Sequence, residues 1–281
     1  MKILLIGATG RLGRDLGPEL AKRHEVIAWG SRELDIAQSE AVRKAVTGLR
    51  PDLVVLSAAW TDVDRCQADP DGAYRVNAVG PWNVALACQA IGAGMLYVST
   101  DYVFDGRKGS AYDEFDQTGP INVYGATKLA GERFVQQLVP RHYVVRTSWH
   151  FGSHGDCFAK RVLRAAQAGE EVTAAVDQIG SPSYTLDLSR AISELIESEQ
   201  YGLYHLSNRG QCSWYEFAEE IMRLARLPGK PKPVRQESLG RLAPRPKGTP
   251  LRHYCLELLG RDNLRPWQEA LAEFVSKEIQ R

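Results

Sequence analysis

Short apolar runs alternate with longer amphipathic segments along the first half of the chain. Runs at residues 2–6, 25–29, 52–57, 95–99 and 143–147 are too short for helices and are typical of buried parallel strands. Between them, segments at about 11–23, 39–49, 81–91 and 124–138 carry apolar residues at helical spacing. Strands that alternate with helices predict an α/β fold of the Rossmann type, a doubly wound parallel sheet with helices on both faces.

The pattern changes after about residue 150, where Gly, Pro and Ser recur up to residue 185. Ser213 and Pro266 are expected to begin two amphipathic helices, and residues 201–207 are expected to form a strand that returns to the main sheet. The Pro-rich and Lys/Arg-rich segment 228–250 is expected to be extended and mobile. We therefore predict a first domain over 1–150 with a returning segment near 183–207, and a smaller C-terminal α/β lobe over 151–182 and 208–281.

Three glycines follow the first predicted strand with the spacing G-x-x-G-x-x-G. The first permits a tight turn, the second lets the backbone approach a pyrophosphate, and the third lets helix and strand pack closely. Free N–H groups at the start of the following helix favour an anion. The loop therefore predicts an NAD(P)-binding domain in which the cofactor contacts Gly7, Thr9, Gly10, Arg11, Leu12 and Gly13.

The residues after the second predicted strand bear on the choice of cofactor. An acid there would bond the ribose 2′-hydroxyl, whereas a basic residue accommodates a 2′-phosphate. Ser31 and Arg32 stand at this place, which favours NADPH and leaves NADH possible. The alternative is that Arg32 is a solvated loop charge. Asp35 and Ile36 are expected at the adenine, with a turn or capping role as the alternative for Asp35.

Tyr124 and Lys128 form a Y-x-x-x-K pair, one turn apart on one face of a predicted helix. Thr100 closes a predicted strand at the edge where such sheets bind ligands. Lowering the pKa of a tyrosine by about three units requires roughly 4 kcal/mol. An ammonium about 4 Å away supplies about 4 kcal/mol at an effective dielectric constant of 20. We therefore expect Lys128 to tune Tyr124 as a proton donor and Thr100 to bond the substrate oxygen, the alternative being an ordinary amphipathic helix.

Composition limits the partners. The formal net charge is +1 and charged residues make up 25% of the chain, so neither nucleic acid nor a membrane surface is expected as a partner. No apolar run is long enough to span a bilayer, and the apolar run at the N-terminus is too short for a signal peptide. The five scattered cysteines contain no C-x-x-C pair, which favours reduced thiols in a cytoplasmic protein.

Longer blocks at 58–64 (AAWTDVD), 99–106 (STDYVFDG) and 120–132 (PINVYGATKLAGE), with 146–149 and 177–182, resemble the extended short-chain dehydrogenase/reductases. Within that superfamily the chain is similar, nearly end to end, to the dTDP-4-dehydrorhamnose reductase family. The resemblance implies an NAD(P)H-dependent oxidoreductase that reduces the C4 keto group of dTDP-4-dehydro-β-L-rhamnose to dTDP-L-rhamnose, a nucleotide sugar used in carbohydrate biosynthesis for cell-surface polysaccharide. It also implies that the C-terminal lobe binds the substrate.

The resemblance assigns roles at matching positions. Thr100, Tyr124 and Lys128 would be catalytic, and Ala58, Ala59, Trp60 and Thr61 would also line the dinucleotide. The substrate would contact Val63, Thr100, Asp101, Tyr102, Tyr124, Trp149 and Arg245. Arg245 would bind its diphosphate, unless it is a solvated charge. The alternative for Val63 and Trp149 is packing in the core.

Other functions stay open. Related dehydratases usually place Asp-Glu after the active-site threonine, whereas Asp101-Tyr102 follows Thr100 here, which favours plain reduction. A related 4-keto-deoxysugar reductase, an epimerase or dehydratase, or a non-catalytic regulatory subunit are the alternatives. His150-Phe151, Cys157 and 249–251 depart from the family pattern near the predicted lobe.

No metal site is predicted from the two histidines at 150 and 154, because Gly152 and Gly155 argue against a helix there. The resemblance leaves Mg²⁺ binding open. Carboxylates at a dimer interface would bind the ion, and Asp15 would be one of them. The alternative is that Asp15 is an ordinary charge on the surface of a helix. Either a monomer or a homodimer is compatible with the sequence.

Overall fold

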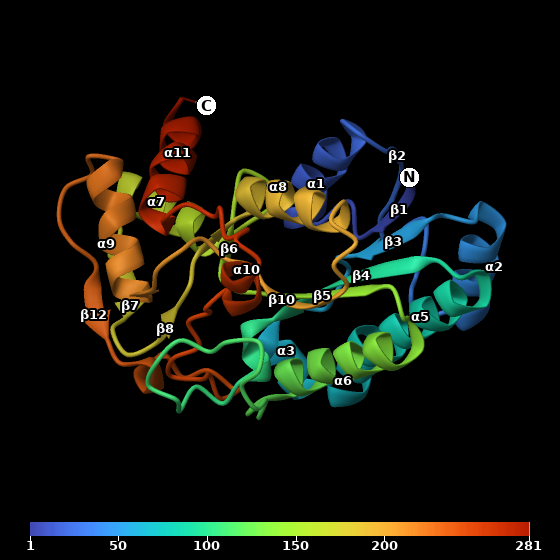
Figure 1. Ribbon diagram of the computed structural model, residues 1–281. Coiled ribbons are helices and arrows are strands. Elements are labelled where there is room, and N and C mark those ends of the chain that lie inside the picture. The colour runs from blue at the N-terminus through green and yellow to red at the C-terminus, as the bar shows by residue number, and fades with distance from the viewer. Residues whose placement is uncertain (281) are drawn as a thin grey trace.

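The computed structural model describes residues 1–280, so Arg281, the last residue of the predicted lobe, lies outside the described residues. A six-stranded sheet with the order β10-β5-β4-β3-β1-β2 forms the centre of the molecule, and every neighbouring pair in it is parallel (Figure 1). Its strands are β1 (Lys2–Ile6), β2 (Glu25–Trp29), β3 (Leu53–Leu56), β4 (Gly94–Thr100), β5 (His142–Thr147) and β10 (Gly202–His205). The predicted doubly wound α/β fold is confirmed.

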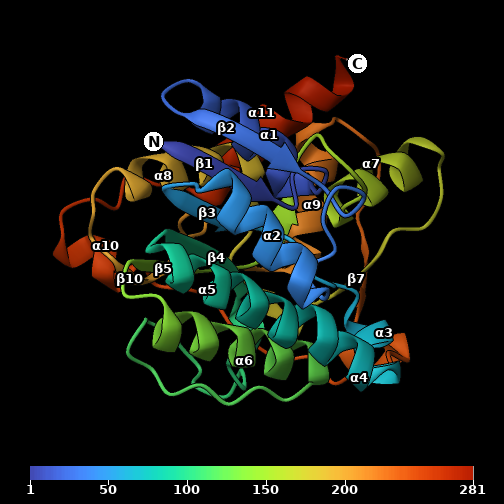
Figure 2. The ribbon, with the colours of Figure 1, turned by 90° about the vertical axis from the view of Figure 1, so that its right-hand side faces the viewer.

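Helices cover both faces of this sheet. α1 (Arg11–Ala21) and α8 (Thr185–Ile196) lie on one face, and α2 (Ser39–Leu49), α5 (Gly80–Ile91) and α6 (Val123–Leu138) lie on the other (Figures 1 and 2). Leu5 of β1 belongs to the apolar cluster under α1 and α8, and its neighbour Leu4 belongs to the cluster under α2 and α5. Because both faces are buried, β1 is apolar throughout instead of alternating with polar residues.

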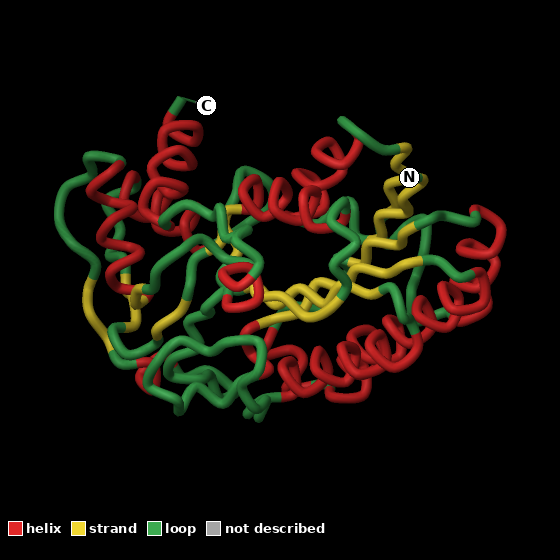
Figure 3. The backbone as a smooth tube through the Cα atoms, viewed as in Figure 1, coloured by secondary structure: helices red, strands yellow, loops and turns green. Residues whose placement is uncertain are grey.

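The C-terminal lobe lies at one end of the sheet (Figure 3). It is built from two stretches that are separate in the sequence. Its core contains a cluster of aromatic rings that includes Phe151, Phe217 and Phe274. The first stretch holds β6 (His150–Phe151), α7 (Phe158–Gln167), β7 (Thr173–Ala175) and β8 (Ile179–Gly180), and β9 (Ser183–Tyr184) leads back to α8 and β10. The second stretch holds β11 (Cys212–Ser213), α9 (Trp214–Leu224), β12 (Lys232–Val234) and α11 (Trp267–Ile279). Between β12 and α11, α10 (Tyr254–Leu258) packs back against β10, with Leu256 in the core under α8.

The Pro-rich segment 228–250 is bonded to the rest of the molecule along much of its length. β12 pairs in parallel with β7, with Lys232 opposite Thr173. Further along, the backbone N–H of Thr249 donates to the carbonyl of Ile179 at 3.0 Å. These partners lie far away in the sequence, so the local composition that suggested a mobile segment contained no sign of them.

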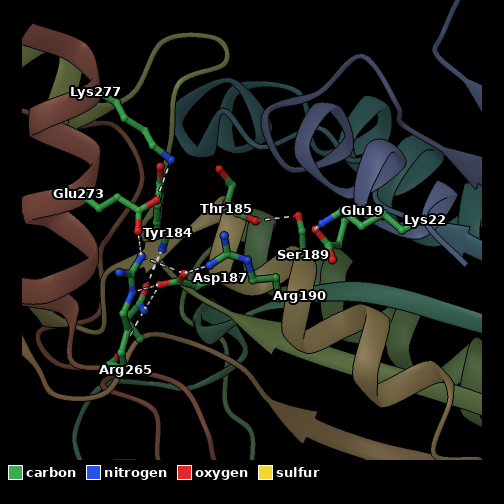
Figure 4. A network of polar contacts seen from close by, with 11 residues as sticks. Glu19, Lys22, Tyr184, Thr185, Asp187, Ser189, Arg190, Arg265, Glu273 and Lys277 are labelled. Carbon is green, nitrogen blue, oxygen red and sulfur yellow. Dashed lines mark hydrogen bonds and ion pairs between the residues drawn. The ribbon is translucent and has the colours of Figure 1, made fainter. Parts of the chain in front are cut away.

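An ion network joins the end of the lobe to α8. Asp187 is buried on α8 and accepts from Nε and Nη2 of Arg265 at 2.8 and 3.0 Å. Arg265 also donates to Glu273 of α11 at 2.6 Å, and Lys277 donates to the other oxygen of Glu273 (Figure 4). Within residues 1–280, no helix has the length and apolar character needed to cross a membrane.

Candidate active site

The carboxyl ends of β1, β3, β4 and β5 and the facing wall of the C-terminal lobe enclose a cleft of about 940 Å³. The sheet side of the cleft is made by the glycine loop and by the ends of the strands, including Thr100. The lobe side is made by residues of α7 and α9, including Phe158 and Trp214. A cleft at the carboxyl ends of parallel strands is where open α/β sheets bind ligands.

The glycine loop has the geometry that a dinucleotide phosphate needs. Gly7 has φ +94°, and a Cβ there would lie 2.5 Å from the backbone N of Ala58. A Cβ at Gly13 would lie 2.2 Å from the carbonyl oxygen of Gly7, so only glycine permits this close packing of α1 on the loop. Gly10 is the N-cap of α1 and offers no side-chain cap, which leaves N–H groups of the first helical turn available to an anion. The residues present therefore fit a dinucleotide cofactor.

Most of the residues predicted for the cofactor line this cleft, but Arg32 and Trp60 do not. Arg32 is exposed, and Asp35 accepts from the backbone N–H of Ala37 at 3.0 Å, as in the alternative turn role. The backbone of Trp60 is held from both sides by the amide of Asn77, at 2.8 and 2.9 Å. The predicted residues on the cleft wall are Gly7, Thr9, Gly10, Arg11, Leu12, Gly13, Ser31, Asp35, Ile36, Ala58, Ala59, Thr61, Tyr124 and Lys128.

Trp60 lies outside the cleft because its ring packs against a helical segment that sequence patterns did not predict. This segment comprises α3 (Val63–Ala68), α4 (Pro70–Tyr74) and a π-helical turn at Arg75–Val79. The guanidinium of Arg65 lies 5.4 Å from the Trp60 ring centre, and a Cβ at Gly72 would lie 2.7 Å from the same ring. Asn77 is buried and also donates to Thr127 at 3.2 Å, so it connects the Trp60 loop to α6.

Thr100, Tyr124 and Lys128 all line the cleft, as predicted from their positions in the sequence. Thr100 is the last residue of β4, and Asn122 caps α6 by accepting from the N–H of Gly125 at 2.8 Å. A Cβ at Gly125 would lie 2.1 Å from the carbonyl oxygen of Tyr102, so α6 begins in direct contact with the turn after Thr100. This close approach brings Tyr124, the second residue of α6, to the same part of the cleft as Thr100.

Lys128 is not among the groups that influence the pKa of Tyr124 in this structure, so its predicted role in tuning Tyr124 stays a prediction. Burial raises the pKa of Tyr124 well above its ordinary value, against a smaller effect of the Thr100 hydrogen bond. Lys128 is itself buried, and its Nζ donates to the carbonyl of Val98 at 2.8 Å and lies 4.0 Å from the ring centre of Tyr97. Burial lowers the pKa of Lys128 to about 7, with Glu132 acting in the opposite direction. Burial is therefore the largest influence on the pKa of both side chains.

Asp101 is buried behind Thr100 and belongs to a chain of hydroxyl contacts. Its carboxylate accepts from Thr100 Oγ1 at 3.1 Å and from Thr249 Oγ1 of the C-terminal segment. Burial raises the pKa of Asp101 to about 7, and the two threonine hydroxyls act against this rise. Thr249, which the sequence marked only as a departure from the family pattern, thus contacts the group next to the catalytic set.

Tyr102 extends this cluster toward the lobe. Its ring meets that of Tyr124 edge to face with centres 5.8 Å apart, and its hydroxyl accepts from Gln178 Nε2 at 3.1 Å. Burial raises the pKa of Tyr102 to about 12. Tyr102 therefore stays protonated at neutral pH.

Four further residues predicted for the substrate, Val63, Asp101, Tyr102 and Trp149, line the cleft, but Arg245 does not. Arg245 donates to both carboxylate oxygens of Asp64 on α3 at 3.0 Å, and its side chain is 9% exposed. The hydrogen bonds to Asp64 lower the pKa of that carboxyl. Because this ion pair holds the guanidinium away from the cleft wall, the structure does not support the predicted contact with the diphosphate. Arg11 and Arg161 are the arginines that reach the cleft.

The residues considered for a metal are placed in other contacts. Asp15 accepts from Thr185 Oγ1 at 2.5 Å and lies 3.4 Å from His154 Nε2. His150 Nε2 lies 3.0 Å from Thr147 Oγ1, and burial lowers the pKa of His150 to about 3. Among residues 1–280, no three His, Cys, Asp or Glu side chains form a group that would hold a metal ion.

The Rossmann-type sheet, the glycine loop and the threonine, tyrosine and lysine facing one cleft define a dinucleotide-binding protein of the short-chain dehydrogenase/reductase class. More closely, the chain belongs to the RmlD substrate binding domain family, whose model matches residues 1–279.

Individual relatives match over nearly the whole chain. A dTDP-4-dehydrorhamnose reductase of Streptomyces griseus is 40% identical over 96% of this chain and 91% of its own length. The crystal structure of a dTDP-4-dehydrorhamnose reductase from Clostridium acetobutylicum is 41% identical, with a TM-score of 0.96 over 100% of both chains. The dTDP-4-dehydrorhamnose reductase of Bacillus anthracis, solved in complex with NADP, is also 41% identical, with a TM-score of 0.95 over 98% of this chain and 99% of its own.

Proposed function

We propose that the chain is an NADPH-dependent reductase that converts dTDP-4-dehydro-β-L-rhamnose to dTDP-L-rhamnose by reducing the keto group at C4. The observation that carries this proposal is the meeting of Thr100, Tyr124 and Lys128 in the cleft that also contains the glycine loop. The names of the relatives support the choice of substrate. The NADP complex of the Bacillus anthracis enzyme supports the choice of cofactor, together with Ser31 and Arg32 after β2.

The residues divide the chemistry between them. NADPH, when bound, supplies the hydride that the carbonyl carbon accepts. Tyr124 then protonates the oxygen, and its raised pKa keeps the phenol protonated at neutral pH until that step. Thr100 lines the same cleft as Tyr124 and would hold the same substrate oxygen through its hydroxyl. Burial lowers the pKa of Lys128 to about 7 and Glu132 offsets this only in part, so Lys128 gains a proton more readily as negative charge develops on the phenol beside it.

All of these residues come from one chain, so the proposed reaction needs no residue from a second subunit. The five cysteines are free thiols, which supports a reducing compartment such as the cytoplasm. The proposal includes no metal ion, since hydride and proton transfer are both assigned without one.

The test is a steady-state assay of NADPH oxidation with enzymatically prepared dTDP-4-keto-6-deoxysugar, with the product identified by chromatography. Tyr124→Phe should lower kcat by at least about 100-fold and leave NADPH binding unchanged, because only the proton donor is lost. Tyr74→Phe, at an exposed position on α4, is the matched control and should behave like the wild type.

Two results would contradict the proposal. NADPH oxidation that does not depend on the sugar would exclude this substrate. Protein that retains bound NAD and returns it unchanged after turnover would indicate an epimerase or dehydratase instead.

A further inference from the structure

Trp149 has an unusual backbone conformation on the lobe side of the cleft. Its φ is +44°, in the left-handed region that residues with a side chain seldom adopt. Such a conformation persists only where the surroundings hold it in place. The backbone contributes one hydrogen bond, from the N–H of Ser183 to the carbonyl of Trp149 at 3.2 Å. The rest of the support comes from the side chain of Trp149 and its neighbours.

The indole of Trp149 is held between two features of the lobe. Trp214 stacks on it with ring centres 3.6 Å apart and an angle of 9° between the planes. Gly180 makes room for it, because a Cβ at Gly180 would lie 2.3 Å from Cε2 of the Trp149 ring. The stacked pair and the glycine together leave the Trp149 ring little freedom to turn.

The local structure explains how Trp214 reaches this place. β11 pairs with β8 so that Cys212 lies opposite Gly180. Ser213 then caps α9 in a capping box with Glu216, which makes Trp214 the first residue of the helix. Phe158 of α7 packs on Trp214 with ring centres 4.5 Å apart. The position of Trp214 is therefore fixed by contacts within the lobe that do not involve Trp149.

We propose that Trp214 is a positioning residue that holds the indole of Trp149 against the sugar ring of the substrate. This inference rests on the proposed function. Both indoles line the same cleft as Tyr102 and Tyr124. A flat aromatic surface suits the C–H face of a deoxysugar, and its value for binding depends on a fixed orientation.

The experiment is a double-mutant cycle on substrate binding and turnover. Trp214→Leu should raise KM for the nucleotide sugar about tenfold, equivalent to about 1.4 kcal/mol, and change kcat by less than about threefold. Trp214→Phe should restore most of the loss because it keeps an aromatic face. The double variant Trp149→Leu/Trp214→Leu should be no worse than Trp149→Leu alone, since Trp214 acts through Trp149. Trp82→Leu is the matched control, because Trp82 is also stacked, on Phe134, but lies on α5 outside the cleft.

NADPH affinity, measured by fluorescence, separates positioning from a loss of structure. It should be unchanged in every variant, and near-UV circular dichroism should show the same loss of signal in Trp149→Leu and Trp214→Leu. Additive effects in the cycle, an unchanged KM in Trp214→Leu, or a parallel fall in NADPH affinity would overturn the inference. If the wild type does not turn over the sugar, the proposed function fails, and the dichroism spectra still decide whether Trp214 orders Trp149.

Discussion

Glu132 is the centre of a buried polar cluster that joins α6 to β4 and β5. It is 1% exposed and accepts three hydrogen bonds, from Ser99 Oγ and from Nε and Nη2 of Arg146, the last two at 3.0 and 2.7 Å. Nη1 of Arg146 is buried without a hydrogen-bond partner among the described residues. The buried charge of Arg146 is therefore compensated by this one carboxylate. Glu132→Gln tests how much the ion pair contributes to the free energy of unfolding.

The expected cost follows from this geometry. A glutamine at position 132 keeps the size of the side chain but removes the negative charge and replaces one acceptor by a donor. Removing one partner of a buried ion pair costs about 3–5 kcal/mol, because the other charge stays buried without compensation. For a chain of this length the unfolding entropy near the melting temperature is about 0.6 kcal/mol/K, so Tm should fall by roughly 5–9 °C.

Differential scanning calorimetry at pH 7 measures this change. Glu40→Gln is the matched control, because Glu40 makes a similar two-bond contact with Arg43 on the exposed side of α2. Solvent screens that pair, so Tm should change by less than about 1 °C. A second variant, Glu132→Leu/Arg146→Met, removes both charges and should recover part of the lost stability. A Glu132→Gln variant that melts within about 1 °C of the wild type would refute the idea that Arg146 depends on Glu132.

Three further predictions concern other sites. Burial raises the pKa of Asp101 from 3.8 to about 7, so the folded protein holds a proton that the unfolded chain releases between these values. Wild-type Tm should therefore fall relative to Asp101→Asn as the pH rises from about 5 to 8, and parallel curves would contradict this. Arg32→Glu should lower the ratio of kcat/KM for NADPH to that for NADH at least about tenfold; an unchanged ratio would make Arg32 a solvated charge. Arg245→Met should lower Tm and leave KM for the sugar unchanged, because Arg245 binds Asp64; a raised KM with an unchanged Tm would restore the diphosphate role.

The first strands and helices of the chain were predictable because their signals are local. The apolar runs at 2–6 and 25–29 predict strands and the stripe at 39–49 predicts a helix, and β1, β2 and α2 have these bounds. Each of these elements contains its own evidence, an apolar run or an apolar stripe at helical spacing. The glycine loop and the Tyr124–Lys128 pair are local in the same sense. The glycines lie within one loop, and Tyr124 and Lys128 lie one helical turn apart on α6.

The rest of the site depends on contacts between distant residues. Thr249 hydrogen-bonds to Asp101, and Gln178 hydrogen-bonds to Tyr102. The partners in each pair lie far apart in the sequence. Single hydroxyl and amide side chains carry no periodic pattern, so nothing in the sequence marks them as partners. The placement of Arg245 was missed for the same reason, because its partner Asp64 lies far away in the sequence.

α8 is a different case, because its signal was present in the sequence. Leu188, Ile192 and Leu195 follow helical spacing and are buried in the cluster that α8 shares with α1. The Gly-, Pro- and Ser-rich composition just before α8 is typical of turns and obscures this stripe. The predicted start of the last helix at Pro266 differs from the observed start by one position. Pro266 is the N-cap of α11, and Trp267 is the first helical residue.

The path of the chain between its two parts has a mechanical consequence. The backbone crosses from the sheet to the lobe after β5, returns at β9 to build α8 and the edge strand β10, and crosses again before β11. The chain returns to the sheet once more at α10, whose Leu256 lies in the core under α8, and crosses to α11 from there. The lobe is thus attached by five connections instead of one, and any opening or closing of the cleft must bend them together. Cutting the gene after residue 150 would also remove the edge strand of the sheet, so the first domain is not expected to be produced as a stable fragment.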